Sequence, residues 1–352
     1  MPDPKRTSAA VPPEVAKMLR DVARPEYLTE DGRLVGRHDV SSLFNGWRYV
    51  AIGARMVKIA PETTFHEFLE GLVGETLGRA WVAAQQAKPR QDRHPIAQWQ
   101  TDLALLRTRP PVAVRGGVSE ATGTGSSLAF LTLAYDLYSI LHCGALPTPL
   151  VKRLKLASEF QGARYEVAVA ALFARAGFTL EWIRDYSRKR PEFIAAHKTT
   201  GERVAVEAKS RHRAGVLAQG GVAEVDAMKA DLDGLLRAAL QKETDGLPFA
   251  IYLDANLPIV GNDESAAWTN DVERMLNGRP APTRERPDPF AAITVTNFSW
   301  HYAGDAAAPS RSESVMVLPK YSRAPLRDDR TLRLIFEAGR QYGAVPATFP
   351  SA

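Results

Sequence analysis

At 352 residues, 45% hydrophobic and 24% charged, the chain has an ordinary globular composition and is long enough for two domains. Its one cysteine, Cys143, excludes an intrachain disulfide and a cysteine-based zinc site, which fits a reducing cytoplasm. The net charge of +5 is concentrated in one region, because residues 151–215 hold 14 Lys and Arg against 7 Asp and Glu. The rest of the chain carries 31 basic against 33 acidic residues.

The first 40 residues are rich in proline and charge and lack the apolar core of a signal peptide, so we expect a flexible lead-in to a cytoplasmic protein. Hydrophobic spacing then predicts a mainly helical region up to about residue 150. One amphipathic helix begins near Phe65, with Thr64 or Thr63 as its cap and Glu67 near the capping-box position. The other predicted segments are a short helix at Glu14–Val22, a strand or helix at Trp47–Ile59, a helix at Pro95–Thr108 and an apolar helix at Leu128–Leu146.

The apolar stretch Leu128–Leu146 contains Asp136 and is close to the lower length limit for a membrane span, so a buried helix is the better interpretation and no membrane partner is expected. The Gly/Ser-rich loop Thr122–Ser127 lacks the lysine and the spacing of a P-loop. Prolines 147 and 149 mark a domain boundary at about 145–155. We therefore expect a helical N-terminal domain, residues 1–150, that selects a substrate, a partner protein or a second copy of the chain.

Residues 151–352 alternate between helical and strand patterns, which predicts an α/β domain with a mixed sheet flanked by helices. Predicted helices are Val151–Ala176 with a break near Gly162, Val222–Leu240, Ala266–Leu276 and Leu332–Tyr342. Predicted strands are Phe178–Ile183, Pro248–Leu253, Ile293–Tyr302 and Ser314–Leu318, together with a hairpin within Pro191–Arg213.

The hairpin is the centre of the functional prediction. Its four-residue loop, Lys198–Gly201, ends in a glycine that tolerates positive φ. A symmetric loop pairs residues whose numbers add to 399, so Glu192 lies opposite Glu207, with Cβ atoms roughly 4.5–5.5 Å apart. Lys209 is two residues after Glu207 and therefore projects to the same side of the strand. Two acids that meet on one sheet face repel each other, and a divalent cation relieves that repulsion.

These residues carry a resemblance. Pro191-Glu192 followed, after a short hairpin, by Glu207-Ala208-Lys209 resembles the PD-(D/E)xK signature of the restriction-endonuclease-like nucleases. The order of elements over residues 160–260 is similar as well. The resemblance implies a restriction-endonuclease-like fold and a metal-dependent endonuclease that hydrolyses phosphodiester bonds, in DNA rather than RNA, in restriction, repair or defence.

The resemblance also implies roles for single residues. Glu192, Glu207 and the Ala208 carbonyl would hold Mg²⁺ or Mn²⁺, carboxylates being hard oxygen ligands suited to these ions. Lys209 would orient or deprotonate the attacking water or offset transition-state charge, and the sequence leaves these roles open. Glu166 on the preceding helix either completes the metal site or faces solvent beside Arg164.

Two basic clusters flank the motif and are expected to contact nucleic-acid phosphates without reading sequence. They are Arg184, Arg188, Lys189 and Arg190 before it, and Arg211, His212 and Arg213 after it. A salt-bridged surface is the alternative for each. The family usually has Asp where this chain has Glu192, and this departure supports a second hypothesis, a catalytically inactive nucleic-acid-binding protein. An interaction or scaffold protein is the third.

Overall fold

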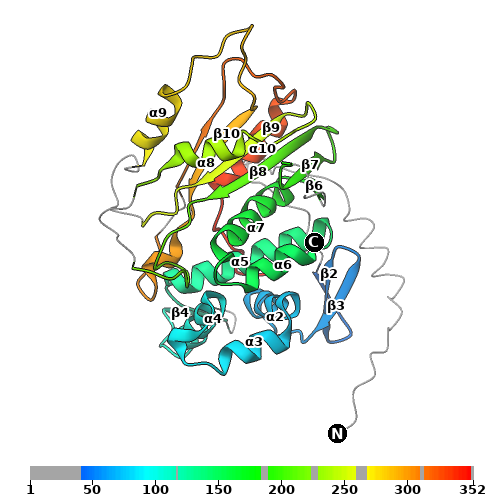
Figure 1. Ribbon diagram of the computed structural model, residues 1–352. Helices are drawn as coiled ribbons and strands as arrows, with labels where there is room; N and C mark the ends of the chain where they lie inside the picture. Colours follow the sequence, from blue (N-terminus) through cyan, green and yellow to red (C-terminus); the bar gives the residue numbers. More distant parts are fainter. Residues whose placement is uncertain are drawn as a thin grey trace.

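The computed structural model describes residues 41–115, 118–183, 189–222, 229–258, 268–309 and 313–349. A six-stranded mixed sheet lies at its centre, in the order β11-β10-β9-β8-β7-β6 (Figure 1). The strands are β6 Phe178–Trp182, β7 Phe193–His197, β8 Arg203–Ser210, β9 Phe249–Asp254, β10 Ala292–Asn297 and β11 Glu313–Val317. β6, β7 and β8 are antiparallel, β8, β9 and β10 run parallel, and β11 is antiparallel to β10. The predicted mixed α/β sheet is therefore confirmed.

The β7–β8 hairpin has the predicted register. Phe193 lies opposite Val206 and Ala195 opposite Val204, so paired numbers add to 399. The turn closes with the Gly201 amide donating to the His197 carbonyl at 2.9 Å, and Gly201 has a φ of +69°. Beyond the strand, the Glu192 amide donates to the Val206 carbonyl at 3.0 Å. The pairing thus extends to the point where Glu192 meets Glu207.

Helices cover both faces of the sheet (Figure 1). On one face, α5 (Gly125–Cys143), α7 (Phe160–Arg175) and α10 (Asp329–Arg340) join one hydrophobic cluster, to which β8 contributes Val204, Val206 and Ala208. On the other, α8 (Leu232–Ala239) and α9 (Thr269–Asn277) pack in a second cluster that includes Ala205. Because side chains alternate along a strand, Glu207 and Lys209 lie on the face of Ala205, towards α8.

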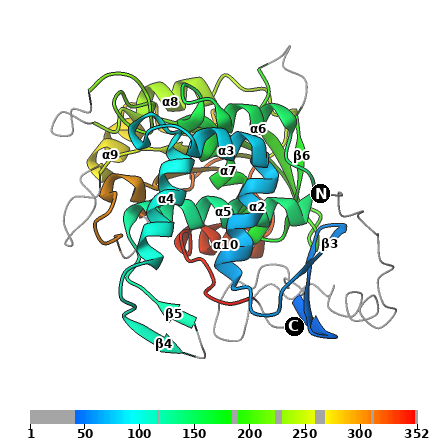
Figure 2. The same cartoon turned by 90° about the horizontal axis from the view of Figure 1, so that it is seen from below.

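The N-terminal half combines helices with two small sheets. Its helices are α2 Phe65–Leu77, α3 Arg79–Gln86, α4 Pro95–Arg107 and α5, with a 3-10 turn, η1, at Arg90–Asp92. Its strands are β1 Ser41–Phe44, β2 Trp47–Ile52, β3 Arg55–Ile59, β4 Ala113–Arg115 and β5 Val118–Glu120. Trp47–Ile59 is therefore an antiparallel hairpin. Figure 2 looks onto the helical layer, from which the β4–β5 hairpin projects.

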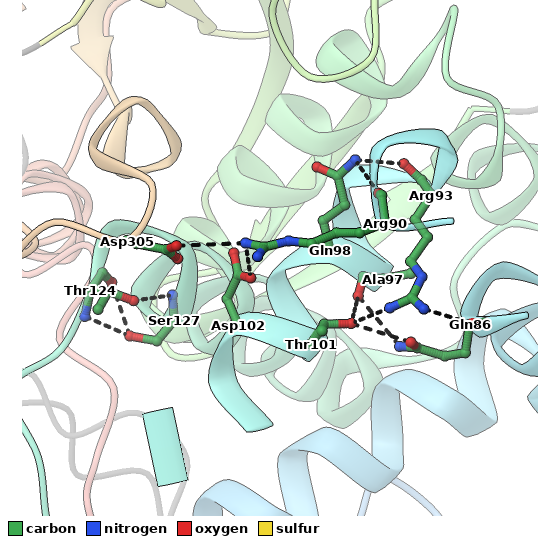
Figure 3. Close-up of polar contacts among 10 residues, drawn as sticks. All are labelled: Gln86, Arg90, Arg93, Ala97, Gln98, Thr101, Asp102, Thr124, Ser127 and Asp305. Carbon is green, nitrogen blue, oxygen red and sulfur yellow. Dashed lines mark hydrogen bonds and ion pairs between the residues drawn. The ribbon is translucent and has the colours of Figure 1, made fainter. Parts of the chain in front are cut away.

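Caps fix where two of these helices begin. The Thr64 hydroxyl accepts from the Glu67 amide, and the Glu67 carboxylate accepts from the Thr64 amide, as predicted. Thr124 and Ser127 form the same reciprocal pair at the start of α5 (Figure 3). Figure 3 also shows Arg90 between Asp102 and Asp305. Its Nη2 lies 2.6 Å from Asp102 on α4 and 3.6 Å from Asp305, which follows the 3-10 turn Trp300–Ala303.

The hydrophobic core crosses the position of the predicted domain boundary. The cluster of α5 and α7 also contains Val50 of β2, Leu72 of α2 and Tyr252 of β9. Inside it, buried Asp136 of α5 accepts from Arg164 at 2.8 Å, Arg175 at 2.9 Å and the Tyr342 hydroxyl at 2.7 Å. The two halves therefore share one core and one buried polar network. Within the described ranges, no helix is both long and apolar enough to cross a membrane.

Several predicted elements differ from the structure. The helix predicted at Val151–Ala176 is interrupted after α6 (Thr148–Lys155), where Leu156 is extended, and not at Gly162. The helix predicted from Val222 is not continuous, because Asp231 has a left-handed φ of +47° and α8 begins after it. The strand predicted to reach Tyr302 ends at Asn297, and a 3-10 turn, η3, follows at Trp300–Ala303. The predicted helix Glu14–Val22 lies outside the described residues.

Candidate active site

One lysine bridges the two acidic residues of the hairpin. The Lys209 ammonium lies 2.5 Å from Glu207 Oε1 and 3.5 Å from Glu192 Oε1. The hairpin produces this arrangement because the register brings Glu192 level with Glu207, while Lys209 is one pleat further along β8. Burial opposes the charge of Lys209, but the carboxylates of Glu207 and then Glu192 raise its pKa overall. The lysine is therefore an ammonium at neutral pH.

Glu207 is the most enclosed acid of the group, with no exposed surface. A second cation, the Lys242 ammonium, lies 3.1 Å from its Oε1. Its Oε2 is buried and has no hydrogen-bond partner among the described residues. Burial, followed by the charge of Glu192, raises the pKa of Glu207, and the two lysines lower it. An unpartnered oxygen on a buried carboxylate is costly, so this atom can accept a hydrogen bond from a water or take a further ligand.

Glu166 reaches the same cluster from α7. It is buried, and Arg153 Nη1 donates to its Oε2 at 2.6 Å. Burial, followed by the charge of Glu192, raises the pKa of Glu166 to about 7, and Glu207 adds to the shift. The three carboxylates are therefore close enough to influence one another. Glu166 is therefore buried and does not face solvent, and its expected part in a metal site stays a prediction.

The basic residues before the motif have structural partners. Lys189 donates to the Gln241 side chain at 2.7 Å, and Arg190 pairs with Asp245. Both partners lie between α8 and β9. Arg184 and Arg188 lie outside the described residues. The salt-bridged alternative thus applies to Arg190. Lys189 forms a hydrogen bond with the same segment between α8 and β9.

The basic residues after the motif divide into two kinds. Arg211 is partly exposed and pairs with Asp231 at 2.9 Å. The His212 ring lies beside Gly162 of α7, and its pKa is lowered by burial and then by the charge of Arg153. Arg213 requires a correction. It is buried, and its guanidinium donates to the carbonyls of Asn256, Lys229 and Ala255, so it supports two loops and is not available to a phosphate.

Two further cations of this cluster, Arg153 and Lys242, are not indicated by any sequence motif. Arg153 belongs to α6, and Lys242 follows α8, so each reaches the acids through tertiary packing. Neither is part of a motif; Arg153 lies in the basic region 151–215, whereas Lys242 lies outside it. The structure thus pairs three acids with three cations at the end of the hairpin.

The acids fit a hard divalent cation by their chemistry. Carboxylate oxygens suit Mg²⁺, which keeps several waters and therefore needs few protein ligands. Glu207 Oε2 is an unused oxygen of this kind, and Glu192 lies across the lysine from it. Ala208 lies between Glu207 and Lys209 in β8, opposite Tyr252 of β9. Across the described residues, however, no three His, Cys, Asp or Glu side chains are arranged closely enough to hold a metal together.

Comparisons of the chain with protein-family models, with curated proteins and with solved structures give no match in any of the three. The function must therefore be argued from the residues themselves.

Proposed function

We propose that this chain is a metal-dependent endonuclease with a restriction-endonuclease-like core, which hydrolyses phosphodiester bonds in DNA. The observation that carries the proposal is the buried Glu207 carboxylate, whose Oε2 has no hydrogen-bond partner among the described residues, beside Glu192 and a bridging lysine. The order of helix α7, strand β6, hairpin β7–β8 and helix α8 supports it. It also agrees with the resemblance of the P-E and E-A-K residues to the PD-(D/E)xK signature.

In this proposal Glu192 and Glu207 hold Mg²⁺ or Mn²⁺, the Ala208 carbonyl and Glu166 being further ligands. A bound ion would supply Lewis acidity and a water of lowered pKa. Glu166 can serve as a ligand only when ionised, and its pKa of about 7 makes its participation sensitive to pH near neutrality.

The protonation of Lys209 favours one of the roles left open by the sequence. A lysine whose pKa is raised carries its proton at neutral pH and cannot remove one from water. Its ammonium can instead donate to the attacking water or to a phosphoryl oxygen on which negative charge develops. We therefore assign Lys209 the task of offsetting charge in the transition state.

Nucleic acid would reach the site past Arg211 and His212, which lie on the loop immediately after β8. Arg211 is partly exposed, and it forms an ion pair with the half-exposed Asp231. Such a surface pair contributes little stability, so phosphate can replace the carboxylate at small cost. Arg213 is excluded from this role by its burial.

The test is a cleavage assay with plasmid DNA and single-stranded RNA, with Mg²⁺, with Mn²⁺ and with chelator. We expect metal-dependent cleavage of DNA, and a loss of about 100-fold or more in Glu207→Gln and in Lys209→Met. Glu181→Gln is the matched control. Glu181 is an exposed acid of β6 in the same sheet, paired with Arg203 at 2.7 Å, and its loss should leave the rate unchanged. Equal cleavage by wild type and both site variants would refute the proposal.

The second candidate function is nucleic-acid binding without catalysis. It is favoured by one observation, the absence among the described residues of a three-ligand metal group, and it agrees with Glu in place of the usual Asp at position 192. It predicts salt-sensitive binding that persists in Glu207→Gln, with no cleavage under any metal condition.

A further inference from the structure

The segment between α8 and β9, Gln241–Asp245, is fastened to the two residues that precede Pro191. Four contacts join the two stretches, and none is part of a strand ladder. Lys189 Nζ donates to Gln241 Oε1 at 2.7 Å, the Glu243 amide to the Lys189 carbonyl at 2.7 Å and Lys242 Nζ to the Arg190 carbonyl at 2.8 Å, and Arg190 pairs with Asp245. This segment therefore fixes the position from which the chain reaches Glu192.

Lys242 differs from the rest of this segment because it also faces the acids. Its ammonium lies 3.1 Å from Glu207 Oε1 while it donates to the Arg190 carbonyl, and about one fifth of its side chain is exposed. Lys209 also pairs with Glu207, and Arg153 pairs with Glu166 and with the half-exposed Glu159. A divalent cation at this group would therefore compete with cations that already hold the carboxylates.

We propose that Lys242 is a place-holding cation: it neutralises Glu207 while no metal is bound, and it turns to a substrate phosphate when a divalent ion takes its place. The second half of this inference rests on the proposed nuclease function, whereas the first half concerns metal binding alone.

The chemistry of lysine suits this exchange. An ammonium on a flexible four-carbon stem can leave one anion for another, which a buried bidentate arginine does less easily. Its departure would leave Lys209 as the one cation on Glu207 Oε1 and would remove a positive charge that competes with an ion at the unpartnered Oε2. A phosphate close to the acids would then stabilise the released ammonium. Metal and nucleic acid should therefore each strengthen the binding of the other.

The test measures Mn²⁺ binding to the full chain without nucleic acid, from the electron paramagnetic resonance signal of free Mn²⁺. Lys242→Gln keeps a donor for the Arg190 carbonyl and removes the charge. We expect Mn²⁺ to bind it about tenfold more tightly than wild type, because a competing cation close to the acids is gone. Lys189→Gln changes the stretch that contacts this segment and leaves the acids untouched, so this variant should bind Mn²⁺ as wild type does.

Lys242→Arg is the conservative variant, expected to restore wild-type Mn²⁺ affinity because it restores the charge. Thermal unfolding of all variants shows whether they fold. If Lys242→Gln does not fold, the comparison uses Lys242→Met with the same expectation. Cleavage of DNA at saturating metal provides the second readout, and we expect it to fall about tenfold in Lys242→Gln while metal affinity rises. A merely structural role would not move the two readouts in opposite directions.

Each outcome separates the two proposals. Tighter Mn²⁺ binding by Lys242→Gln with no cleavage by any protein supports the place-holding role and refutes the nuclease. Cleavage by wild type with unchanged or weaker Mn²⁺ binding by Lys242→Gln overturns the place-holding role and leaves the nuclease. If Lys242→Gln binds Mn²⁺ more tightly than wild type but cleaves DNA equally fast, the proposed movement of the Lys242 ammonium to a substrate phosphate is wrong. No Mn²⁺ binding by either protein overturns both proposals.

Discussion

Glu166 should control part of the pH dependence of stability. Its pKa is about 7 in the folded protein, raised from 4.5 first by burial and then by the charge of Glu192. Between these two pH values the folded protein holds a proton that the unfolded chain has lost. The free energy of unfolding of the metal-free protein should therefore fall as pH rises from 4.5 to 7, by about 3 kcal/mol from this group.

Glu166→Gln removes this titration, so the decline in unfolding free energy across that window should become smaller. Denaturant titrations in chelator at several pH values measure it. Glu159→Gln is the control, because Glu159 pairs with the same arginine, Arg153, at 3.3 Å but is half exposed. An unchanged slope in Glu166→Gln, or an equal change in both variants, would contradict the assignment.

Some residue-scale features of the site could be predicted from sequence, and others could not. The meeting of Glu192 and Glu207 follows from the length of one loop, because a short symmetric turn fixes hairpin register. Arg153 and Lys242 come from α6 and from the end of α8, and no local rule says where those helices pack. Arg213 was predicted to contact phosphate but is buried, because a run of basic residues does not reveal which of them is buried.

At the scale of elements, the start of α5 depends on a residue without a side chain. A Cβ at Gly125 would lie 2.3 Å from the Trp300 carbonyl oxygen of the η3 turn and 2.9 Å from the backbone nitrogen of Gly304, which follows that turn. Replacing an ordinary helical glycine with alanine stabilises a helix by roughly 0.8–1 kcal/mol. At Gly125 the sign should reverse, because the helix must move away from the turn, and we expect Gly125→Ala to lower stability by about 1–3 kcal/mol.

Gly71 in α2 is the matched control, since a Cβ there meets nothing within 4 Å. Gly71→Ala should therefore raise the free energy of unfolding by roughly 0.5–1 kcal/mol. Denaturant midpoints of the two variants, measured against wild type, give the sign of each change in the free energy of unfolding. If Gly125→Ala proved as stabilising as Gly71→Ala, the close packing of α5 on η3 would be wrong.

Element types were predicted better than element limits. β9 was recognised as a buried central strand from its apolar run, and all six of its residues are buried. The apolar spacing of Val222–Leu240 suggests a continuous helix, yet the left-handed backbone at Asp231 interrupts it, and α8 begins at Leu232. Periodicity reports which residues face the core but not where a backbone turn interrupts them.

For the whole molecule, the predicted division at residue 150 can be tested as a question of cooperativity. Asp136 of α5 joins α7 through Arg164 and Arg175 and the C-terminal region through Tyr342, and it has no exposed surface. The surrounding hydrophobic cluster includes residues from both sides of the division. A shared core and a shared network imply that the two halves unfold together.

We therefore expect Asp136→Asn to lower the free energy of global unfolding by about 3–5 kcal/mol, because it leaves two largely buried arginines without their counter-charge. Native-state hydrogen exchange should record the same loss at amides of α2 and of β8, which lie on opposite sides of residue 150. Glu70→Gln, which breaks the more exposed pair with Arg107, should cost no more than about 1 kcal/mol. If Asp136→Asn weakened protection in only one half, the chain would consist of two independently stable domains. The proposed site would then have to function without support from α5. An equal loss of exchange protection in both halves would instead show that the position of Glu166 on α7 depends on the whole fold.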